Sequence, residues 1–291
     1  MSGIPQRQLG KTGATVTVLG LGGEGVLRTF GRAPEAVALI RRAVELGITY
    51  CDCAHAYAGS EDYYGEALVG GLRDRVFLTS KSAERSGAAA TRDLESTLRR
   101  MRTDRLDLWQ VHDVRTEGDL AAICGPGGSL EAFVAAKKAG KVRFLGVTGH
   151  HDPAILTKAI ELFSFDTVLM PVNAAEPHHN SFIDVTLPLA VSKGMGVIGM
   201  KVLRGFVEEG VSRIDLHPDL LHQQLSVSRL LRFAFAQTIS TAIIGCNTVQ
   251  QLEENVAVAR VAKPMDAGEE QELVERTRPY ARRAQSYKGT W

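Results

Sequence analysis

The sequence has no long apolar run and no marked excess of charge of one sign. No segment offers the roughly 18 consecutive apolar residues that a membrane-spanning helix needs. The 34 basic and 33 acidic side chains leave a formal net charge of +1, which argues against a nucleic acid or a membrane surface as the main partner. Residues 1–7 hold no apolar signal core.

Cysteine is scarce as well. The chain has four, with no Cys-x-x-Cys pair among them: Cys51, Cys53, Cys124 and Cys246. Few and scattered thiols suit a reducing compartment, so we expect a cytoplasmic protein whose cysteines fill small spaces in the core. No linker, internal repeat or low-complexity tract divides the chain either, and we expect residues 1–291 to form a single domain.

What the sequence does contain is a regular alternation of strand-like and helical segments. After a glycine-bracketed turn that predicts a hairpin at residues 6–15, the strand-like segments are residues 16–19, 48–53, 76–80, 106–111, 144–147, 167–170, 196–200 and 241–244. The helical segments are residues 34–47, 61–72, 88–101, 130–139, 153–162, 183–192, 226–236 and 249–259. Eight such pairs predict a (β/α)8 TIM barrel.

Three further segments lie outside this regular pattern. Residues 267–291 predict an extra C-terminal helix and a tail that reaches either the barrel bottom or its mouth. The connections at residues 113–129 and 201–225 are long, and loops of that length are usually functional or disordered. Because both connections follow strands, they stand on the face where barrel enzymes carry their chemistry, and we expect them to shape access to a site.

Four chemically different side chains follow the predicted strands closely: Asp52, Tyr57, Lys81 and His112. The C-terminal ends of barrel strands meet on one face, so we expect this carboxylate, phenol, ammonium and imidazole to converge on one pocket. Each also has an ordinary alternative. Tyr57 alone suits a packing residue, Lys81 a surface cation and Asp52 a cap for the following helix.

Together the four groups suit proton donation to a substrate. A free phenol has a pKa of about 10 and gives up its proton poorly near neutral pH, but a nearby ammonium lowers that pKa. Lys81 can supply the positive charge while Asp52 holds it in place, which makes Tyr57 the expected general acid. His112 can hydrogen-bond to the carbonyl oxygen of a substrate and fix its angle.

These side chains lie in stretches that resemble the aldo-keto reductase family. In chain order the stretches are Tyr50-Cys-Asp-Cys-Ala-His-Ala-Tyr57, Gly59-Ser-Glu61, Thr79-Ser-Lys81, Val111-His112, Gly140-Lys-Val-Arg-Phe-Leu-Gly-Val-Thr148, Ile243-Ile-Gly245 and Gln251-Leu-Glu-Glu-Asn255. The resemblance implies an enzyme that transfers a hydride from NADPH, with NADH also possible, to an aldehyde, ketone or sugar. It implies four catalytic residues: Asp52, Tyr57, Lys81 and His112.

The resemblance also assigns residues to the cofactor. They are Gly23, Glu24, Asp52, Thr148, Gly149, Met200, Lys201, Leu203, Gly245, Asn247, Gln251 and Asn255. Three places depart from the usual family pattern: Thr148-Gly149 replaces Ser-Asn, Asn173 is the amide nearest to where relatives have Gln, and Met200 replaces a stacking Tyr. The adjacent His150 and His151 substitute at the carboxamide, line the pocket or belong to a solvated loop.

The start of the eighth helix bears on the choice between NADP and NAD. A helix N-terminus attracts anions through its free N–H groups and its dipole. Relatives commonly place Lys or Arg here for the 2′-phosphate, whereas this chain offers Asn247, Thr248 and Gln251. Neutral donors bind phosphate less strongly than charged ones. The resemblance still favours NADP(H), with Asn255 at the adenine.

The expected substrate pocket is lined by Val26, Leu27, His55, Ala83 and Asp113. Ala83 leaves room on one side, and a carboxylate next to the catalytic imidazole favours polar or hydroxylated substrates. The expected partner is a small molecule, with no nucleic acid and no membrane, and the oligomeric state is left open.

Parts of the sequence also suggest three alternatives to this function. Gly20-Leu-Gly-Gly-Glu-Gly25 matches a dinucleotide-binding fingerprint, but the next helix begins only at residue 34 instead of at the last glycine. His178, His179 and His217 suggest a metal hydrolase, but the first strand has no His-x-His, so no metal is expected. The third alternative is a non-catalytic regulatory or sensor protein that binds a nicotinamide nucleotide on the same fold.

Overall fold

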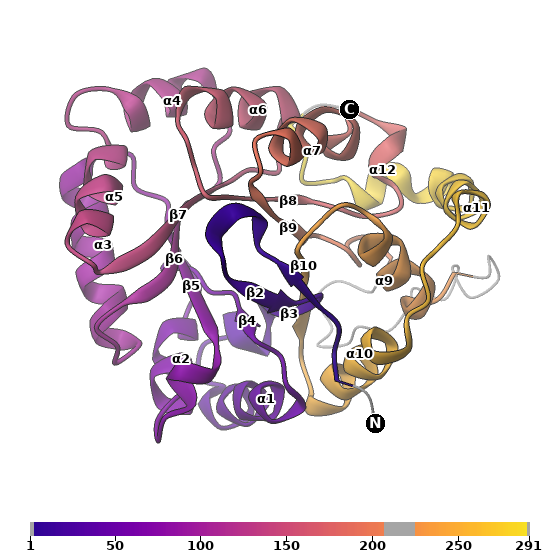
Figure 1. Cartoon of the computed structure of the whole chain (residues 1–291), viewed down its shortest axis with the longest axis horizontal. Helices are drawn as coiled ribbons and strands as arrows, with labels where there is room; N and C mark the ends of the chain where they lie inside the picture. Colours follow the sequence, from indigo (N-terminus) through magenta and orange to yellow (C-terminus); the bar gives the residue numbers. More distant parts are fainter. Residues whose placement is uncertain (1–2, 207–224, 290–291) are drawn as a thin grey trace.

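Eight parallel strands close into a barrel in the structure, a computed structural model that describes residues 3–206 and 225–289. Around the barrel the order is β10-β3-β4-β5-β6-β7-β8-β9, and helices surround it (Figure 1). The strands are β3 (Leu19–Gly25), β4 (Tyr50–Cys51), β5 (Phe77–Ser82), β6 (Leu106–Val111), β7 (Val142–Thr148), β8 (Thr167–Pro171), β9 (Gly196–Met200) and β10 (Thr241–Cys246). The predicted (β/α)8 barrel is confirmed.

The outer helices are α1 (Ala33–Leu46), α2 (Ser60–Ala67), α3 (Gly87–Arg100), α5 (Ser129–Lys138), α6 (Pro153–Leu162), α7 (Phe182–Ser192), α9 (Val227–Ala236) and α10 (Val249–Val261). Several begin at a hydroxyl side chain that accepts a hydrogen bond from a first-turn N–H, as at Ser86, Ser181 and Thr248. The helix predicted at residues 61–72 ends earlier, at Ala67, and Gly70 and Gly71 beyond it have positive φ, which a helix does not allow.

The N-terminal hairpin pairs β1 (Gln6–Gln8) with β2 (Thr15–Thr17) and lies over one end of the barrel (Figure 1). The hairpin is as predicted, but the first barrel strand predicted at residues 16–19 is wrong. Val16 belongs to β2, and the barrel strand runs from Leu19 through the glycine run. Glycine is required there because a Cβ on Gly22 would lie 2.8 Å from backbone atoms of β10.

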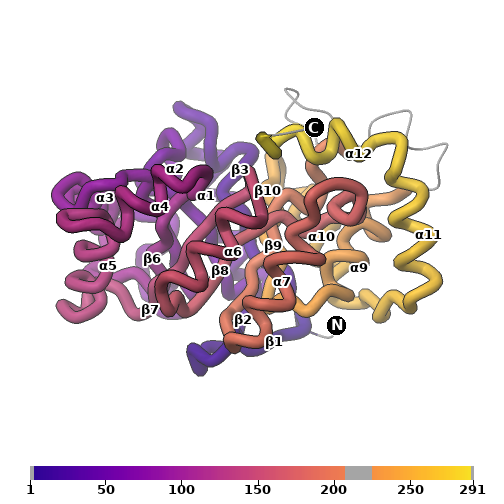
Figure 2. The backbone as a smooth tube through the Cα atoms, turned by 90° about the horizontal axis from the view of Figure 1, so that it is seen from above, coloured from indigo at the N-terminus to yellow at the C-terminus, as the bar shows by residue number. Residues whose placement is uncertain are grey.

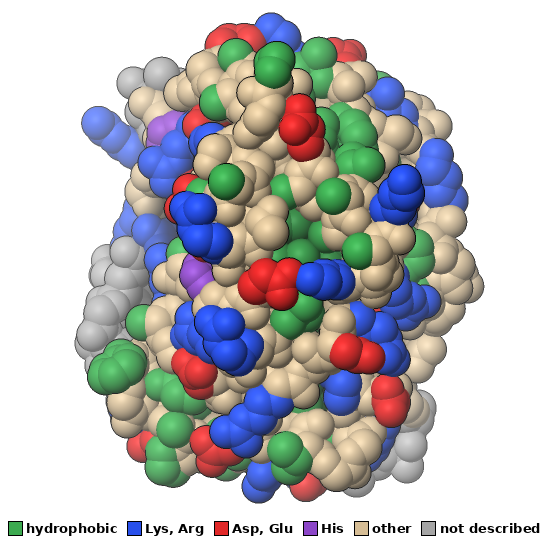
Figure 3. Space-filling model, turned by 90° about the vertical axis from the view of Figure 1, so that its left-hand side faces the viewer, with side chains coloured by type: hydrophobic (Ala, Val, Ile, Leu, Met, Phe, Trp, Pro, Cys, Tyr) green, Lys and Arg blue, Asp and Glu red, His purple; other side chains and the backbone are tan. Residues whose placement is uncertain are grey.

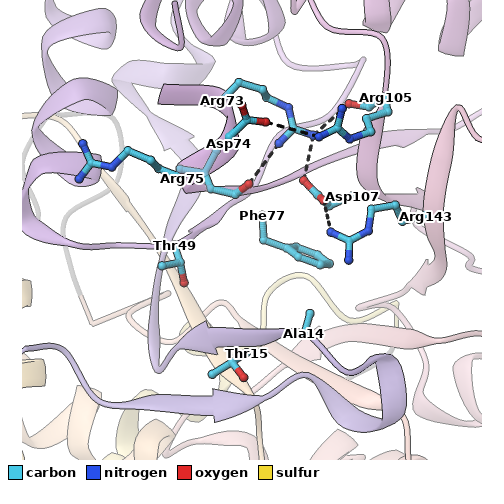
Figure 4. A pocket seen from close by; sticks show the side chains of 11 residues that line it. Ala14, Thr15, Thr49, Arg73, Asp74, Arg75, Phe77, Arg105, Asp107 and Arg143 are labelled. Atoms are coloured by element: carbon cyan, nitrogen blue, oxygen red, sulfur yellow. Dashed lines mark hydrogen bonds and ion pairs between the residues drawn. The ribbon is translucent and has the colours of Figure 1, made fainter. Parts of the chain in front are cut away.

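A buried carboxylate connects three barrel strands at the end of the barrel where the hairpin lies. Asp107 accepts hydrogen bonds from the backbone N–H of Leu78 at 2.9 Å and from Arg143 at 2.7 Å, and Arg73 pairs with it at 2.9 Å. Figure 4 shows both guanidinium groups reaching this carboxylate at a cavity of about 330 Å³, which Phe77 also lines. These bonds help to fix the register of β5, β6 and β7, whose opposite ends carry the candidate site.

The connection after β6 contains a helix that the sequence pattern did not predict. α4 spans Glu117–Cys124, inside the long connection expected at residues 113–129, and begins with a capping box between Thr116 and Asp119. The Thr-x-x-Asp spacing is the sequence signal for it. Of the second long connection, residues 207–224 lie outside the described part of the chain.

The C-terminal segment ends at the mouth of the barrel. The single helix expected over residues 267–283 is divided into α11 (Ala267–Thr277) and α12 (Ala281–Ala284) by a 3-10 turn that contains Pro279. The segment beyond α12 lies at the end opposite to the hairpin (Figure 2). There Gly289 donates its N–H to the carbonyl oxygen of His151, after β7, at 3.3 Å.

Three cysteines are buried, as expected: Cys51, Cys53 and Cys246. Burial raises the pKa of Cys51 and Cys246 to about 12, so both stay protonated thiols. Cys124 was expected in the core as well, but it is exposed, because it occupies the last position of α4 on the surface.

On the face that carries α3 and α5, the surface has no large patch of side chains with the same charge. Basic and acidic side chains are interspersed there, and hydrophobic side chains are scattered between them (Figure 3). Scattered apolar side chains of this kind are normal on a protein surface. Within the described ranges no helix combines the length and the apolarity needed to cross a membrane.

Candidate active site

Asp52 and Lys81 form a buried ion pair at the C-terminal ends of β4 and β5. The ammonium lies 2.7 Å from each carboxylate oxygen and 2.7 Å from the carbonyl oxygen of Cys53, so all three of its donors are used. Thr79 donates a further hydrogen bond to the carboxylate at 3.3 Å. Both charged residues are only 1% exposed, and burial raises the pKa of Asp52 while the Lys81 charge opposes the rise.

Tyr57 lies beside this pair. The Lys81 ammonium is 5.1 Å from the centre of its ring, and the guanidinium of Arg28 is 4.8 Å away. Within the described part of the chain, the hydroxyl group has no hydrogen-bond partner. Burial raises the pKa of Tyr57 well above its usual value, and Asp52 adds to the rise. The net lowering of this pKa that the sequence predicts does not occur, because burial and the Asp52 carboxylate raise the pKa by more than nearby positive charge lowers it.

The glycine run of β3 gives the Tyr57 ring its place. A Cβ on Gly23 would lie 2.6 Å from a carbon of that ring and 3.1 Å from the carbonyl oxygen of Asp52. The run is therefore a barrel strand packed against the site, and it is not the strand-to-helix turn that holds a pyrophosphate in a dinucleotide-binding fold.

His112 faces Tyr57 across the site. The two ring centres are 5.9 Å apart and the ring planes are nearly perpendicular, at 80°. Among the described residues, its buried Nδ1 has no hydrogen-bond partner. Burial, helped by the Lys81 charge, lowers the pKa of His112 to about 3, so the imidazole is neutral at neutral pH. The structure thus brings all four predicted catalytic side chains to one place.

We expect His112 to make the free energy of unfolding fall as the pH drops from about 7 to about 4. Its pKa is about 3 in the folded chain but about 6.5 when unfolded. Between these values the unfolded chain binds a proton that the folded chain does not, so acid favours unfolding, by on the order of 3 kcal/mol at pH 4. Urea unfolding at both pH values should show a smaller drop for His112→Gln than for the unmodified protein. Equal drops would contradict the depressed pKa.

The residues expected at the nicotinamide end surround the same mouth. Thr148, at the end of β7, accepts a hydrogen bond from the backbone N–H of Asp113 at 2.8 Å. Met200 ends β9, and Lys201 follows with a left-handed φ of 60°. The Lys201 ammonium lies 3.9 Å from the Glu24 carboxylate, and burial lowers its pKa. Of the remaining two, Gly149 follows Thr148 and Leu203 is buried.

The residues expected at the adenosine end meet at the start of α10. Asn247 donates its backbone N–H to the side-chain oxygen of Gln251 at 2.8 Å, and Thr248 caps the helix. Gln251 and Asn255 line a small hollow of about 90 Å³ between α9 and α10. Gly245 lies against β3, where a Cβ would meet that of Glu24 at 2.7 Å.

The residues expected to line the substrate pocket lie in different surroundings. Val26 and Leu27 are buried in the main hydrophobic core. Ala83 is exposed just after β5. Asp113 lies next to His112 and has a left-handed φ of 56°, which is uncommon for a residue other than glycine.

His55, also expected in that pocket, turns toward helices α2 and α3. Its Nδ1 lies 3.1 Å from the Glu61 carboxylate and its Nε2 3.4 Å from Asp93. Glu61 is itself buried and accepts hydrogen bonds from Ser80 and Thr97. The bond with Glu61 raises the pKa of His55, and the ring is held in a network behind β4 and β5.

The C-terminal tail contributes residues that the sequence did not suggest. The Tyr287 hydroxyl donates to the buried Glu176 carboxylate and accepts a hydrogen bond from the Asn173 amide at 3.1 Å. Lys288 pairs with the same carboxylate at 3.1 Å. No periodicity predicts these contacts, since they join residues more than 100 positions apart.

No group of three or more His, Cys, Asp or Glu side chains that could hold a metal ion occurs within residues 3–206 and 225–289. His178 instead contacts the carbonyl oxygen of Val274 at 2.7 Å, which ties the loop after β8 to α11. His217 lies outside the described residues.

The chain matches known proteins over most of its length. L-galactose dehydrogenase from Arabidopsis thaliana is 26% identical over 294 residues, which cover 88% of each chain. An aldo-keto reductase from Bacillus halodurans in its holo form superimposes with a TM-score of 0.76 at 23% identity, over 94% of this chain and 96% of that one. An aldo/keto reductase from Klebsiella pneumoniae, solved with NADP and acetate, gives 0.70 at 25% identity over 94% of each chain.

The family model that matches is described as the aldo/keto reductase family. It aligns with residues 18–274, from the start of the barrel to the middle of α11. This range includes Asp52, Tyr57, Lys81 and His112. On this match the chain is an oxidoreductase that belongs to the aldo/keto reductase family.

Proposed function

We propose that this protein reduces an aldehyde or ketone to an alcohol with NADP(H) as the hydride donor, and that Tyr57 donates the proton. One observation carries the proposal. A buried ion pair of Lys81 and Asp52 lies beside Tyr57, and His112 faces the same phenol from the other side. An acid, a charge that stabilises its anion and a hydrogen-bonding imidazole are the groups that carbonyl reduction needs.

Each side chain has its own role in this reaction. When bound, the reduced nicotinamide supplies the hydride. Tyr57 gives its proton to the carbonyl oxygen as negative charge develops there, and its raised pKa keeps the phenol protonated beforehand. The Lys81 ammonium, 5.1 Å from the ring centre, then stabilises the phenolate. The neutral imidazole of His112 hydrogen-bonds to the carbonyl oxygen and fixes its angle.

The residues around the mouth suit a nicotinamide dinucleotide. Lys201 is a largely buried cation whose carboxylate partner, Glu24, is 3.9 Å away, so a pyrophosphate would provide a better counter-charge. The N-terminus of α10 and the hollow beside Gln251 and Asn255 would take the adenosine end. The similar protein from Klebsiella pneumoniae was solved with NADP.

The substrate in this proposal is a small carbonyl compound or sugar. The similarity to an L-galactose dehydrogenase supports a sugar-like substrate, and so do the polar groups of His112 and Asp113 at the mouth. A cytoplasmic location is part of the same proposal and rests on the scattered cysteines.

Asn247→Arg should strengthen NADPH binding relative to NADH binding by about 10-fold. The residue stands just before the N-terminus of α10, where neutral groups now meet any phosphate. An arginine there would add a charge-assisted hydrogen bond to the 2′-phosphate, which NAD lacks. Titrations of both nucleotides followed by fluorescence measure the two affinities. An unchanged ratio would mean that this helix start does not contact the 2′-phosphate.

A titration followed by turnover separates an enzyme from a nucleotide sensor. The purified protein is first titrated with NADPH and with NADH, and simple aldehydes are then added while the nicotinamide absorbance is followed. Oxidation of the nicotinamide on adding aldehyde is expected. Tight binding without oxidation of either nucleotide would favour the regulatory alternative, and failure to bind either one would refute the proposed cofactor.

A further inference from the structure

The wall of the site beside His112 is formed by a second imidazole and a carboxylate. Nδ1 of His150, in the loop after β7, lies 3.5 Å from Oδ1 of Asp113. Both side chains are partly buried, with 21% and 15% of their surface exposed. His112 is the neighbour of Asp113 in the chain, so the three groups lie together just beyond the C-terminal ends of β6 and β7.

The backbone of Asp113 is held in a conformation that costs free energy. Its φ of 56° is left-handed, which costs a residue other than glycine about 1 kcal/mol or more. Its N–H donates to Thr148 at 2.8 Å, its carbonyl oxygen accepts from Arg85 at 2.8 Å, and its Oδ2 accepts from Arg115 at 2.7 Å. Three side chains thus hold the residue, and its second carboxylate oxygen, Oδ1, lies near His150.

Hydrogen-bonding capacity on this wall is left unused. Among the described residues, Oδ1 of Asp113 and Nδ1 of His112 are both buried and without a hydrogen-bond partner. His150 forms no hydrogen bond within the same residues beyond its long contact with Asp113. Buried polar groups in proteins are almost always paired, so unpaired groups at the mouth of a site point to a ligand that brings the missing partner.

The Asp113 carboxylate determines which kind of hydrogen-bond partner His150 can bind. A neutral imidazole has one N–H, and an acceptor near one ring nitrogen draws the proton to that nitrogen. Burial lowers the pKa of His150 to about 4, so the ring is neutral at neutral pH. With Asp113 beside Nδ1, the proton lies on Nδ1 and Nε2 becomes an acceptor. An acceptor at this position suits a hydroxyl group of the substrate.

The C-terminal tail keeps His150 in place. The rings of His150 and Tyr287 are 6.0 Å apart at 85°, and Tyr287 is anchored through its hydroxyl to Glu176. The neighbouring His151 contacts the carbonyl oxygen of Tyr287 at 2.8 Å. The imidazole is therefore fixed on two sides, by Asp113 and by the tail, which is what an orientation-specific contact requires.

We propose that His150 is a specificity-determining residue that accepts a hydrogen bond from a hydroxyl next to the reacting carbonyl, with Asp113 as the residue that positions its ring. The protein would thereby favour α-hydroxy carbonyl compounds over carbonyl compounds of the same size without the hydroxyl. This inference rests on the carbonyl reduction proposed above and adds a substrate preference and the residue responsible for it.

Two aldehydes with the same three-carbon chain test the inference: glyceraldehyde, which carries hydroxyls, and propanal, which does not. We expect kcat/KM for glyceraldehyde to exceed that for propanal by at least about 10-fold, since propanal offers no hydroxyl to the His150 acceptor. His150→Phe, which keeps a ring but removes both nitrogens, should lower this ratio by at least about 10-fold. His150→Gln keeps an acceptor oxygen and should recover part of it.

Asp113→Ala provides the test of positioning. It should lower the same ratio, and combining it with His150→Phe should lower the ratio no further, because both changes remove one interaction. Cofactor affinity, measured by fluorescence, checks that each variant is folded. An equal kcat/KM for the two aldehydes, an unchanged ratio in His150→Phe, or additive effects of the two changes would each overturn the inference. If neither aldehyde is reduced by the unmodified protein, the proposed carbonyl reduction itself fails.

Discussion

Replacing Tyr57 by phenylalanine should lower turnover at least about 100-fold and leave both the fold and the cofactor affinity intact. The change removes only the phenolic proton donor, and general acid catalysis is worth roughly 10² to 10⁴-fold. The fold should survive because the hydroxyl has no partner among the described residues, while the ring keeps its place against Gly23. The measurement is kcat with a small aldehyde, together with a thermal unfolding scan and an NADPH titration.

A matched change at another buried tyrosine controls for the loss of any phenol. Tyr64 is fully buried, and its hydroxyl donates to the backbone carbonyl oxygen of Asp52 at 3.2 Å. Tyr64→Phe should lower stability by about 1 kcal/mol and reduce turnover far less than Tyr57→Phe. Near-normal turnover in Tyr57→Phe would exclude Tyr57 as the acid.

Lys81→Met should have the largest effect on stability, a loss of about 3–5 kcal/mol at neutral pH, and should also abolish most turnover. The change leaves the Asp52 carboxylate buried without its counter-charge, and breaking a buried ion pair in this way costs that much. Burial alone already raises the pKa of Asp52, and losing the Lys81 charge removes the main effect that opposes the rise.

The stability loss in Lys81→Met should depend on pH, because the pKa of Asp52 is raised in the folded chain. In Lys81→Met the folded chain holds a proton on Asp52 that the unfolded chain releases near its ordinary pKa. Stability should therefore fall as pH rises through the raised pKa, so the deficit is larger at pH 8 than at pH 5. Urea unfolding at both pH values measures it.

The double variant Asp52→Asn with Lys81→Met removes both charges and should recover part of the stability but none of the activity. A double variant as unstable as Lys81→Met alone would show that the unpaired charge is not the cause.

Hydrophobic alternation carried the prediction of the fold, and it failed where glycine replaces the apolar residues. Val16 looked like the first barrel strand because it is apolar, yet it pairs with Arg7 in the hairpin. The observed strand β3 is rich in glycine, which has a low β propensity. Without side chains, these residues show no alternation that would indicate a strand. Its glycines are set by contacts with Tyr57 and β10, and these exist only in the folded barrel.

The sequence predicts which residues form the candidate site better than it predicts their pKa values and hydrogen bonds. Strand ends fix where Lys81 and His112 stand, so their convergence with Asp52 and Tyr57 could be inferred from the sequence. The pKa of Tyr57 could not be inferred from the sequence, because it depends on burial and on the pairing of Lys81 with Asp52. The Lys81 ammonium donates all its hydrogen bonds to Asp52 and to the carbonyl oxygen of Cys53. The spacing of these residues in the sequence does not predict this geometry.

By itself the sequence determined the barrel, the family and the set of four side chains, because strand and helix periods are local and the C-terminal ends of parallel strands must meet on one face. Only the tertiary structure decided that His55 turns away toward α2 and α3, that the tail reaches the mouth, and that Asp113 points an unpaired oxygen at His150. These outcomes depend on burial and on contacts between residues far apart in the chain. Such contacts arise from packing, and they leave no periodic trace in the sequence.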